Sequence, residues 1–162
     1  MLVALALLAG CGFRPLYGNL GREAGSESVA EAMARIEIAP IPDRIGQQVR
    51  NGLLDALVTR GTTEKPEFVL RVRLTEGTSD LAVQKTAFAT RAILTVNADF
   101  QLVDISTGAS IVSSNSHATA SLNILKSEFA TLMAEKNARQ RAIKQVVDDI
   151  RLKIATALER RS

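Results

Sequence analysis

The sequence contains no tryptophan, and aromatic residues make up only 4% of its 162 residues. Such a chain has no evident stacking platform for bases, so nucleic-acid binding is not expected, and its core must be aliphatic. It has one cysteine, Cys11, which excludes an intramolecular disulfide. It also has one histidine, His117, with no second histidine to share a metal ion. We therefore expect neither a disulfide nor a metal centre.

Groupings of catalytic residues are equally scarce. His117 lies among Ser and Thr residues with no carboxylate at a useful spacing, which predicts a surface or cross-strand role. Asp148 and Asp149 are adjacent on a predicted helix and point in different directions, unlike a paired general acid and base. No glycine-rich phosphate loop occurs. The sequence thus predicts a binding or assembly protein with no catalytic residues, not an enzyme.

The amount of charge is ordinary, but its distribution is uneven. Hydrophobic residues make up 46% and charged residues 23%, as in a globular domain. The net charge is +3, and the segment 127–162 alone accounts for it. A basic helix face there could meet an anionic partner such as lipid phosphates, or could simply be solvated.

The N-terminus predicts a lipid anchor. Residues 2–9 are apolar and uncharged, which is too short to span a bilayer but fits the hydrophobic region of a signal peptide. Leu8-Ala9-Gly10-Cys11 resembles the lipobox of bacterial lipoproteins, which implies cleavage of residues 1–10 and attachment of diacylglycerol and an N-acyl chain to Cys11. Several acyl chains at about 0.8 kcal/mol per buried methylene hold a protein on a membrane. The alternative, a buried cysteine in a strand, is disfavoured because Cys11 ends the apolar run.

Residues 11–33 are rich in glycine and charge, and predict a flexible tether before a single domain over 34–162. Within that domain, alternating residues predict strands over 35–38, 68–75, 85–103 and 109–121. Helical spacing predicts helices over 43–61 and 127–160. The predicted stripe of the last helix is Leu132, Ala142, Ile143, Val146, Val147, Ile150, Ile154 and Leu158. At about 1.5 Å per residue, this helix exceeds a small domain, so one end should project or the helix should kink.

Two glycines, Gly46 and Gly52, lie inside the first predicted helix. Each costs about 1 kcal/mol relative to alanine, so we expect close packing against a neighbour at these positions. The order β-α-β-β-β-α predicts an α+β fold, a two-layer sandwich with two helices packed on a mainly antiparallel four-stranded sheet. The other face of that sheet, which bears Arg71, Arg73 and Arg91, should be exposed or held for a partner.

A longer motif points to a family. Cys11-Gly12-Phe13-Arg14-Pro15-Leu16-Tyr17-Gly18 resembles the LptE family of lipopolysaccharide-assembly lipoproteins, and the similarity extends through the segment 123–130 to the long final helix. The resemblance implies a lipoprotein that enters and plugs the LptD β-barrel of the outer membrane, helps it fold, and assists lipopolysaccharide insertion. Its partners would be LptD and lipopolysaccharide, and its position the outer membrane, facing the periplasm and the barrel lumen.

Under this resemblance, the candidate contacts with lipopolysaccharide or the barrel are basic: Arg71, Arg73, Arg91, Lys126 and Lys136. The alternative for each is ordinary solubilising charge. Gly12 also supports outer-membrane delivery, since an Asp there would favour retention at the inner membrane under the general sorting rule. Two other functions stay open, an auxiliary lipoprotein of a lipid-trafficking ABC transporter and an envelope hydrolase.

Overall fold

The computed structural model describes residues 28–57, 65–81, 90–125 and 127–161. The helices are α1 (Val29–Ala34), α2 (Asp43–Leu57) and α3 (Glu128–Glu159). The strands are β1 (Ile36–Ile38), β2 (Phe68–Leu81), β3 (Thr90–Asp104) and β4 (Ser110–Ile124). They form one sheet in the order β1-β2-β3-β4, with β1 parallel to β2 and the other pairs antiparallel. The α+β class, the four-stranded sheet and the predicted order of its elements are confirmed.

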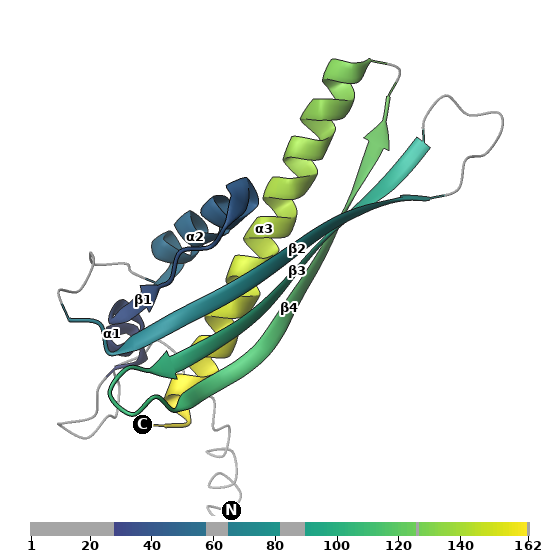
Figure 1. Cartoon of the computed structure of the whole chain (residues 1–162). Helices are drawn as coiled ribbons and strands as arrows, with labels where there is room; N and C mark the ends of the chain where they lie inside the picture. The colour runs from purple at the N-terminus through teal and green to yellow at the C-terminus, as the bar shows by residue number, and fades with distance from the viewer. Residues whose placement is uncertain (1–27, 58–64, 82–89, 126, 162) are drawn as a thin grey trace, which may run out of the picture.

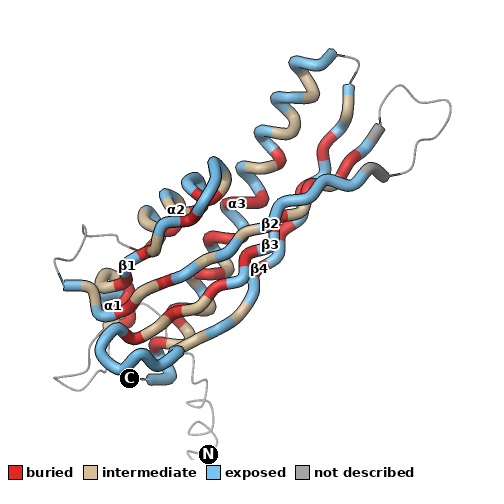
Figure 2. Tube along the Cα trace, in the orientation of Figure 1, coloured by how far each residue is buried: buried red, intermediate tan, exposed pale blue. Residues whose placement is uncertain are grey.

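The helices form one layer and the sheet forms the other (Figure 1). Along β3 the even-numbered residues from Ala92 to Leu102 are buried, whereas their odd-numbered neighbours are exposed or half-buried. The same alternation follows β4 and the first half of β2, whereas β2 is exposed on both faces from Thr75 to Ser79 (Figure 2). Period-two burial means that one face of the sheet packs on the core and the other does not. The core lies between the even-numbered face and the apolar stripes of the helices.

A third helix, which the sequence reasoning did not predict, precedes β1. The predicted tether included residues 28–33, but Ser28 caps α1 through a capping box with Glu31, and the side chains of Val29, Ala32 and Met33 are buried. A capping box satisfies two backbone amides at once, which stabilises even a short helix. The remainder of the predicted tether, residues 11–27, lies outside the described residues, as does the signal peptide.

The long helix α3 matches the sheet in length. Its 32 residues span about 48 Å, and strands of 14 and 15 residues span about the same distance. The N-terminal turns of α3 run beyond α2, beside the far ends of β2, β3 and β4 (Figure 1). This end of α3 therefore projects beyond the other helices but stays alongside the sheet, and we call this end of the molecule the tip. Ser127 is the N-cap, as the sequence indicated.

Both glycines of α2 are closely packed. A β-carbon on Gly46 would lie 2.7 Å from Ile41 Cγ2 and 2.8 Å from the Ile41 carbonyl oxygen. On Gly52 it would lie 3.1 Å from Val147 Cγ2 of α3. The helix thus lies against its neighbours where it has no side chain, which confirms the predicted close packing.

Candidate functional site

The uncovered face of the sheet is lined by polar side chains. Its positions are the odd-numbered residues of β2, β3 and β4, which point away from the helices. Among the described residues, no helix covers this face (Figures 1 and 2). It therefore presents Thr, Ser, Asn and Arg side chains over the length of the strands, which makes it a solvated surface and not a second hydrophobic core.

Two of the predicted contact residues lie side by side on this face. Arg71 and Arg73 are both exposed on β2 and stand opposite Gln101 and Asp99 of β3. Directly opposed side chains in an antiparallel pair lie about 5 Å apart at their β-carbons. Residues two apart on one strand face the same way, so the two guanidinium groups share one region of the surface. Such groups can hold a phosphate or a carboxylate with two parallel hydrogen bonds.

Arg91 lies on the same face but at the other end of the sheet. It stands opposite Leu81 of β2 and Asn123 of β4. It lies eight positions before Asp99, the partner of Arg73, which is roughly 27 Å along the strand. The structure therefore brings Arg71 and Arg73 together but leaves Arg91 near the tip.

The centre of the face contains the only histidine of the chain. His117 Nδ1 lies 2.7 Å from Asn97 Oδ1, and both side chains are exposed. These two residues are opposite each other in the β3–β4 ladder. The predicted cross-strand role of His117 is confirmed. Its partner is an amide and not a carboxylate, so the pair does not have the arrangement of a general base with its orienting acid.

Lys136 belongs to the helix layer instead of the sheet face. It is exposed on the outward side of α3, and it follows Phe129, Leu132 and Met133 at helical spacing. The lysine is therefore next to apolar side chains near the tip, separate from the arginines of the sheet. Lys126 and Cys11 lie outside the described residues.

The apolar tip is a feature that sequence reasoning missed. Phe129 is 73% exposed, Leu132 61%, Leu125 45% and Met133 38%. The prediction that Leu132 belongs to the stripe of α3 that packs on the core is wrong, because the fully buried residues of this helix begin only at Ala138. Thr131 holds the turn below this patch, since its hydroxyl donates to the Leu125 carbonyl at 3.2 Å and accepts from the Leu125 amide at 3.0 Å. Clustered exposed apolar side chains often mark interaction sites.

At the opposite end, the β3–β4 turn is joined to the C-terminus of α3. Asp104 is buried and accepts from Ser106 Oγ at 2.6 Å and from Arg161 at 2.7 Å. These hydrogen bonds, together with one from the Thr107 amide, hold the pKa of Asp104 far below its ordinary value. Gly108 has a φ of +69°, so the predicted left-handed turn is confirmed. Arg161 also lies over the Phe68 ring, 5.7 Å from its centroid.

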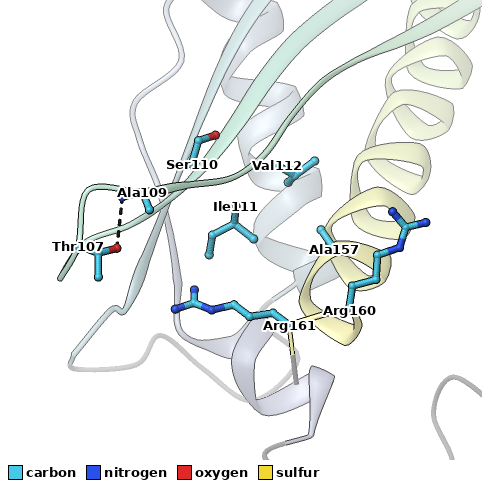
Figure 3. A pocket seen from close by; sticks show the side chains of 8 residues that line it. All are labelled: Thr107, Ala109, Ser110, Ile111, Val112, Ala157, Arg160 and Arg161. Atoms are coloured by element: carbon cyan, nitrogen blue, oxygen red, sulfur yellow. Dashed lines mark hydrogen bonds between the residues drawn. The ribbon is translucent and has the colours of Figure 1, made fainter.

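Beside this turn, a shallow groove of about 590 Å³ lies between the start of β4 and the end of α3 (Figure 3). Ile111, Val112 and Ala157 give it an apolar floor, and Arg160 and Arg161 line its rim. The groove is too open to enclose a small molecule, because cofactor sites bury most of the ligand surface.

Two chemical findings limit what the described residues can do. No group of three or more His, Cys, Asp or Glu among them could hold a metal ion. Within the same part of the chain, no helix is both long and apolar enough to cross a membrane. The polar sheet face and the exposed apolar side chains of the tip are two of the surfaces that these residues present.

The fold is that of known bacterial lipoproteins. A lipoprotein of Caulobacter crescentus has a TM-score of 0.66 at 20% identity, covering 84% of this chain and 98% of its own. Rare lipoprotein B of Shewanella oneidensis has a TM-score of 0.55 at 14% identity, covering 77% and 96%. Lipoprotein B of Nitrosomonas europaea has a TM-score of 0.54 at 16% identity, covering 77% and 86%. No curated protein matches the sequence.

The sequence itself matches the LptE lipopolysaccharide-assembly family over residues 33–154. This match covers three-quarters of the chain, from α1 to the last turns of α3. The chain therefore belongs to the LptE family, and the resemblance found in its sequence is confirmed.

Proposed function

We propose that this protein is a lipid-anchored component of the outer membrane that occupies the lumen of an LptD-type β-barrel and assists the insertion of lipopolysaccharide. The observation that carries the proposal is the uncovered, polar face of the sheet in a chain of the LptE family. The lumen of a large membrane barrel is wet and polar, so a surface rich in Ser, Thr and Asn can face it without exposing apolar groups to water.

The cations have a role in the same proposal. Lipopolysaccharide carries phosphates, and Arg71 and Arg73 offer two adjacent guanidinium groups on the exposed face. Lys136 offers a further charge next to the apolar tip, where acyl chains would find Phe129 and Leu132. The phosphates of lipopolysaccharide would thus bind the arginines of the sheet face and its acyl chains the apolar tip, while the rest of the sheet face contacts the polar wall of the barrel.

The sharpest test reverses charge on the sheet face. The double variant Arg71→Glu/Arg73→Glu should lower the amount of barrel protein or lipopolysaccharide that co-purifies by tenfold or more, equivalent to about 1.4 kcal/mol. The matched control is Lys144→Glu, because Lys144 is an exposed lysine on α3 that pairs with Asp148 at 2.8 Å, away from the sheet face. Unchanged co-purification of both partners in the double variant, with an intact circular dichroism spectrum, would remove the sheet face from the proposal.

Two further measurements address the anchor and the pathway. Mass spectrometry of the mature N-terminus should show acyl chains on Cys11 and the absence of residues 1–10. Depletion of the protein should reduce surface lipopolysaccharide and mature barrel together. Normal levels of both after depletion would contradict the assembly role, and a free thiol would contradict the anchor.

A further inference from the structure

One long edge of the sheet is left open by the described residues. β1 pairs with only three residues at one edge, and β4, with 15 residues, is the outer strand at the other edge. No described strand pairs with the outer side of β4. An outer strand presents a row of backbone amides and carbonyls that can pair with another chain.

The outward groups of β4 belong to its odd-numbered residues. Backbone groups alternate in direction along an antiparallel strand, so every second residue faces away from β3. The Asn115 carbonyl accepts from Lys153 Nζ at 2.6 Å, and the Ser121 carbonyl accepts from Arg141 at 3.1 Å. Both residues are odd-numbered, and between them lie His117 and Thr119, whose amides and carbonyls face the same open side.

β4 has almost none of the features that protect natural edge strands. It contains no charged residue, no proline and no glycine, and its one irregularity is the register shift beside Ile111 at its beginning. The free edge of β2 contrasts with it, because that strand carries Arg71, Arg73, Glu76, Gly77 and Asp80. Charges on an edge strand discourage pairing with other chains, and β4 does not carry them.

The charges next to β4 come from α3 and are mainly positive. Lys153 and Arg141 reach the edge itself, and Arg160 lines the groove at the beginning of the strand (Figure 3). Asp149 is the acid in this row, and it pairs with Lys153 at 2.8 Å. Burial alone would raise the pKa of Asp149, but its interactions with Lys153 and Ser116 together outweigh burial and lower the pKa.

We propose that the outer edge of β4 is a docking site for an extended, acidic segment of another polypeptide, which adds to the sheet as a fifth strand. Main-chain hydrogen bonds to residues such as His117 and Thr119 would supply the affinity. Arg141 and Lys153 would select carboxylates six residues apart. The carbonyls to which they donate, those of Ser121 and Asn115, lie about 20 Å apart along the strand. This edge is distinct from the polar sheet face that carries the proposed function.

A second copy of this chain is a poorer occupant of the edge. Antiparallel pairing of two β4 strands centred near Ala118 would place Asn115 of each copy opposite Ser121 of the other. Lys153, which donates to the Asn115 carbonyl of one copy, would then lie opposite Arg141, which donates to the Ser121 carbonyl of the other. Like charges placed opposite each other are destabilising. An acidic partner turns the same contact into an attraction.

The first test needs no ligand. In hydrogen exchange of the full-length protein, the amides of His117 and Thr119 should exchange at least a hundredfold faster than those of Ala118 and Ala120, which face β3. Slow exchange at the odd-numbered positions would overturn the proposal. If this slow exchange became slower still at higher protein concentration, a second copy of the chain would cover the edge. If it did not depend on concentration, a segment of the same chain would cover it.

The second test uses the peptide acetyl-Glu-Thr-Val-Thr-Val-Thr-Glu-amide as the probe. Binding should shift the amide resonances of His117 and Thr119 more than those of Ala118 and Ala120. Two further peptides each carry one N-methyl group, at one or the other of two adjacent central residues. Only one of them should lose binding, because only alternate amides of the added strand face β4. A peptide with Lys in place of both Glu residues should bind at least fivefold more weakly. Equal binding of the two N-methylated peptides, or of the Glu and Lys peptides, would overturn the proposal.

A pair of protein variants completes the design. Thr119→Pro removes one outward amide, which an edge strand tolerates, and should weaken binding of the probe at least tenfold. The control, Thr119→Val, keeps the amide and should bind like the wild type. If Thr119→Pro does not fold, the N-methylated peptides still decide the question. Retained binding by a folded Thr119→Pro would contradict strand addition.

Discussion

Replacing Gly46 with alanine should destabilise the domain, whereas replacing Gly52 with alanine should be nearly neutral. At Gly46 the new methyl group would meet Ile41 atoms at 2.7, 2.8 and 2.9 Å, and two of these are backbone atoms that cannot rotate away. Overpacking of this kind costs about 1–3 kcal/mol, and the helix preference for alanine returns about 1 kcal/mol. The expected net loss is therefore about 1 kcal/mol, or on the order of 4 °C in Tm for a domain of this size.

At Gly52 the cost of the added methyl group is smaller. Its new methyl group would be close only to Val147 Cγ2, at 3.1 Å, and this is a side-chain methyl group instead of a backbone atom. A shift of a few tenths of an ångström relieves the contact, so the helix preference offsets the cost. We expect the Tm of Gly52→Ala to lie within about 2 °C of the wild type, equivalent to about 0.5 kcal/mol.

Gly77 provides the control for both variants. It lies in β2 with nothing within 4 Å of the position that a β-carbon would take, and its φ is not in the left-handed region. Gly77→Ala should therefore raise stability by about 0.4–1 kcal/mol, because the unfolded chain loses freedom. Urea unfolding of the three variants measures the series. If Gly46→Ala were as stable as Gly77→Ala, the close approach of α2 to Ile41 would not exist.

Further predictions concern the ion pairs and the core. Asp104→Asn should lower the Tm at pH 7, and the difference from wild type should shrink as the pH falls below about 4, because the unfolded chain then takes up a proton that the lowered pKa of the folded carboxyl excludes. Glu76 binds Arg139 with three contacts of 2.7–3.0 Å and raises the pKa of Arg139. A double-mutant cycle with Glu76→Gln and Arg139→Gln should give a coupling of about 1 kcal/mol at low salt, and no coupling would show that solvent screens the pair fully. Ile150→Ala, at a fully buried position of α3, should cost about 2–5 kcal/mol in urea unfolding, and a loss below about 1 kcal/mol would contradict its place in the core.

Much of the fold was predictable because its signals are local. The alternation from Leu94 to Leu102, the turn ended by Gly108 and the N-cap at Ser127 each depend on a few neighbouring residues, and the structure confirms them. The short helix α1 was missed because its six residues sit in a glycine- and serine-rich stretch. Its burial against the core comes from tertiary contacts, which a local pattern does not reveal.

The candidate site was predictable only in part, for the same reason. Period-two alternation placed Arg71, Arg73 and Arg91 on one face correctly, but the distance between Arg91 and the other two depends on strand register. The exposure of Leu132 depends on where the core ends, because the helical spacing continues beyond it. The free edge of β4 follows from the strand order, which local periodicity does not encode.

The last helix of the chain has a consequence for how the molecule is made. α3 packs on both β3 and β4 and supplies Val146, Ile150 and Ile154 to the core. A nascent chain that has emerged only as far as residue 127 would hold a sheet with its even-numbered side chains still in water. Such a chain completes its packing only when α3 has docked on the sheet, so the strands alone do not make a closed core.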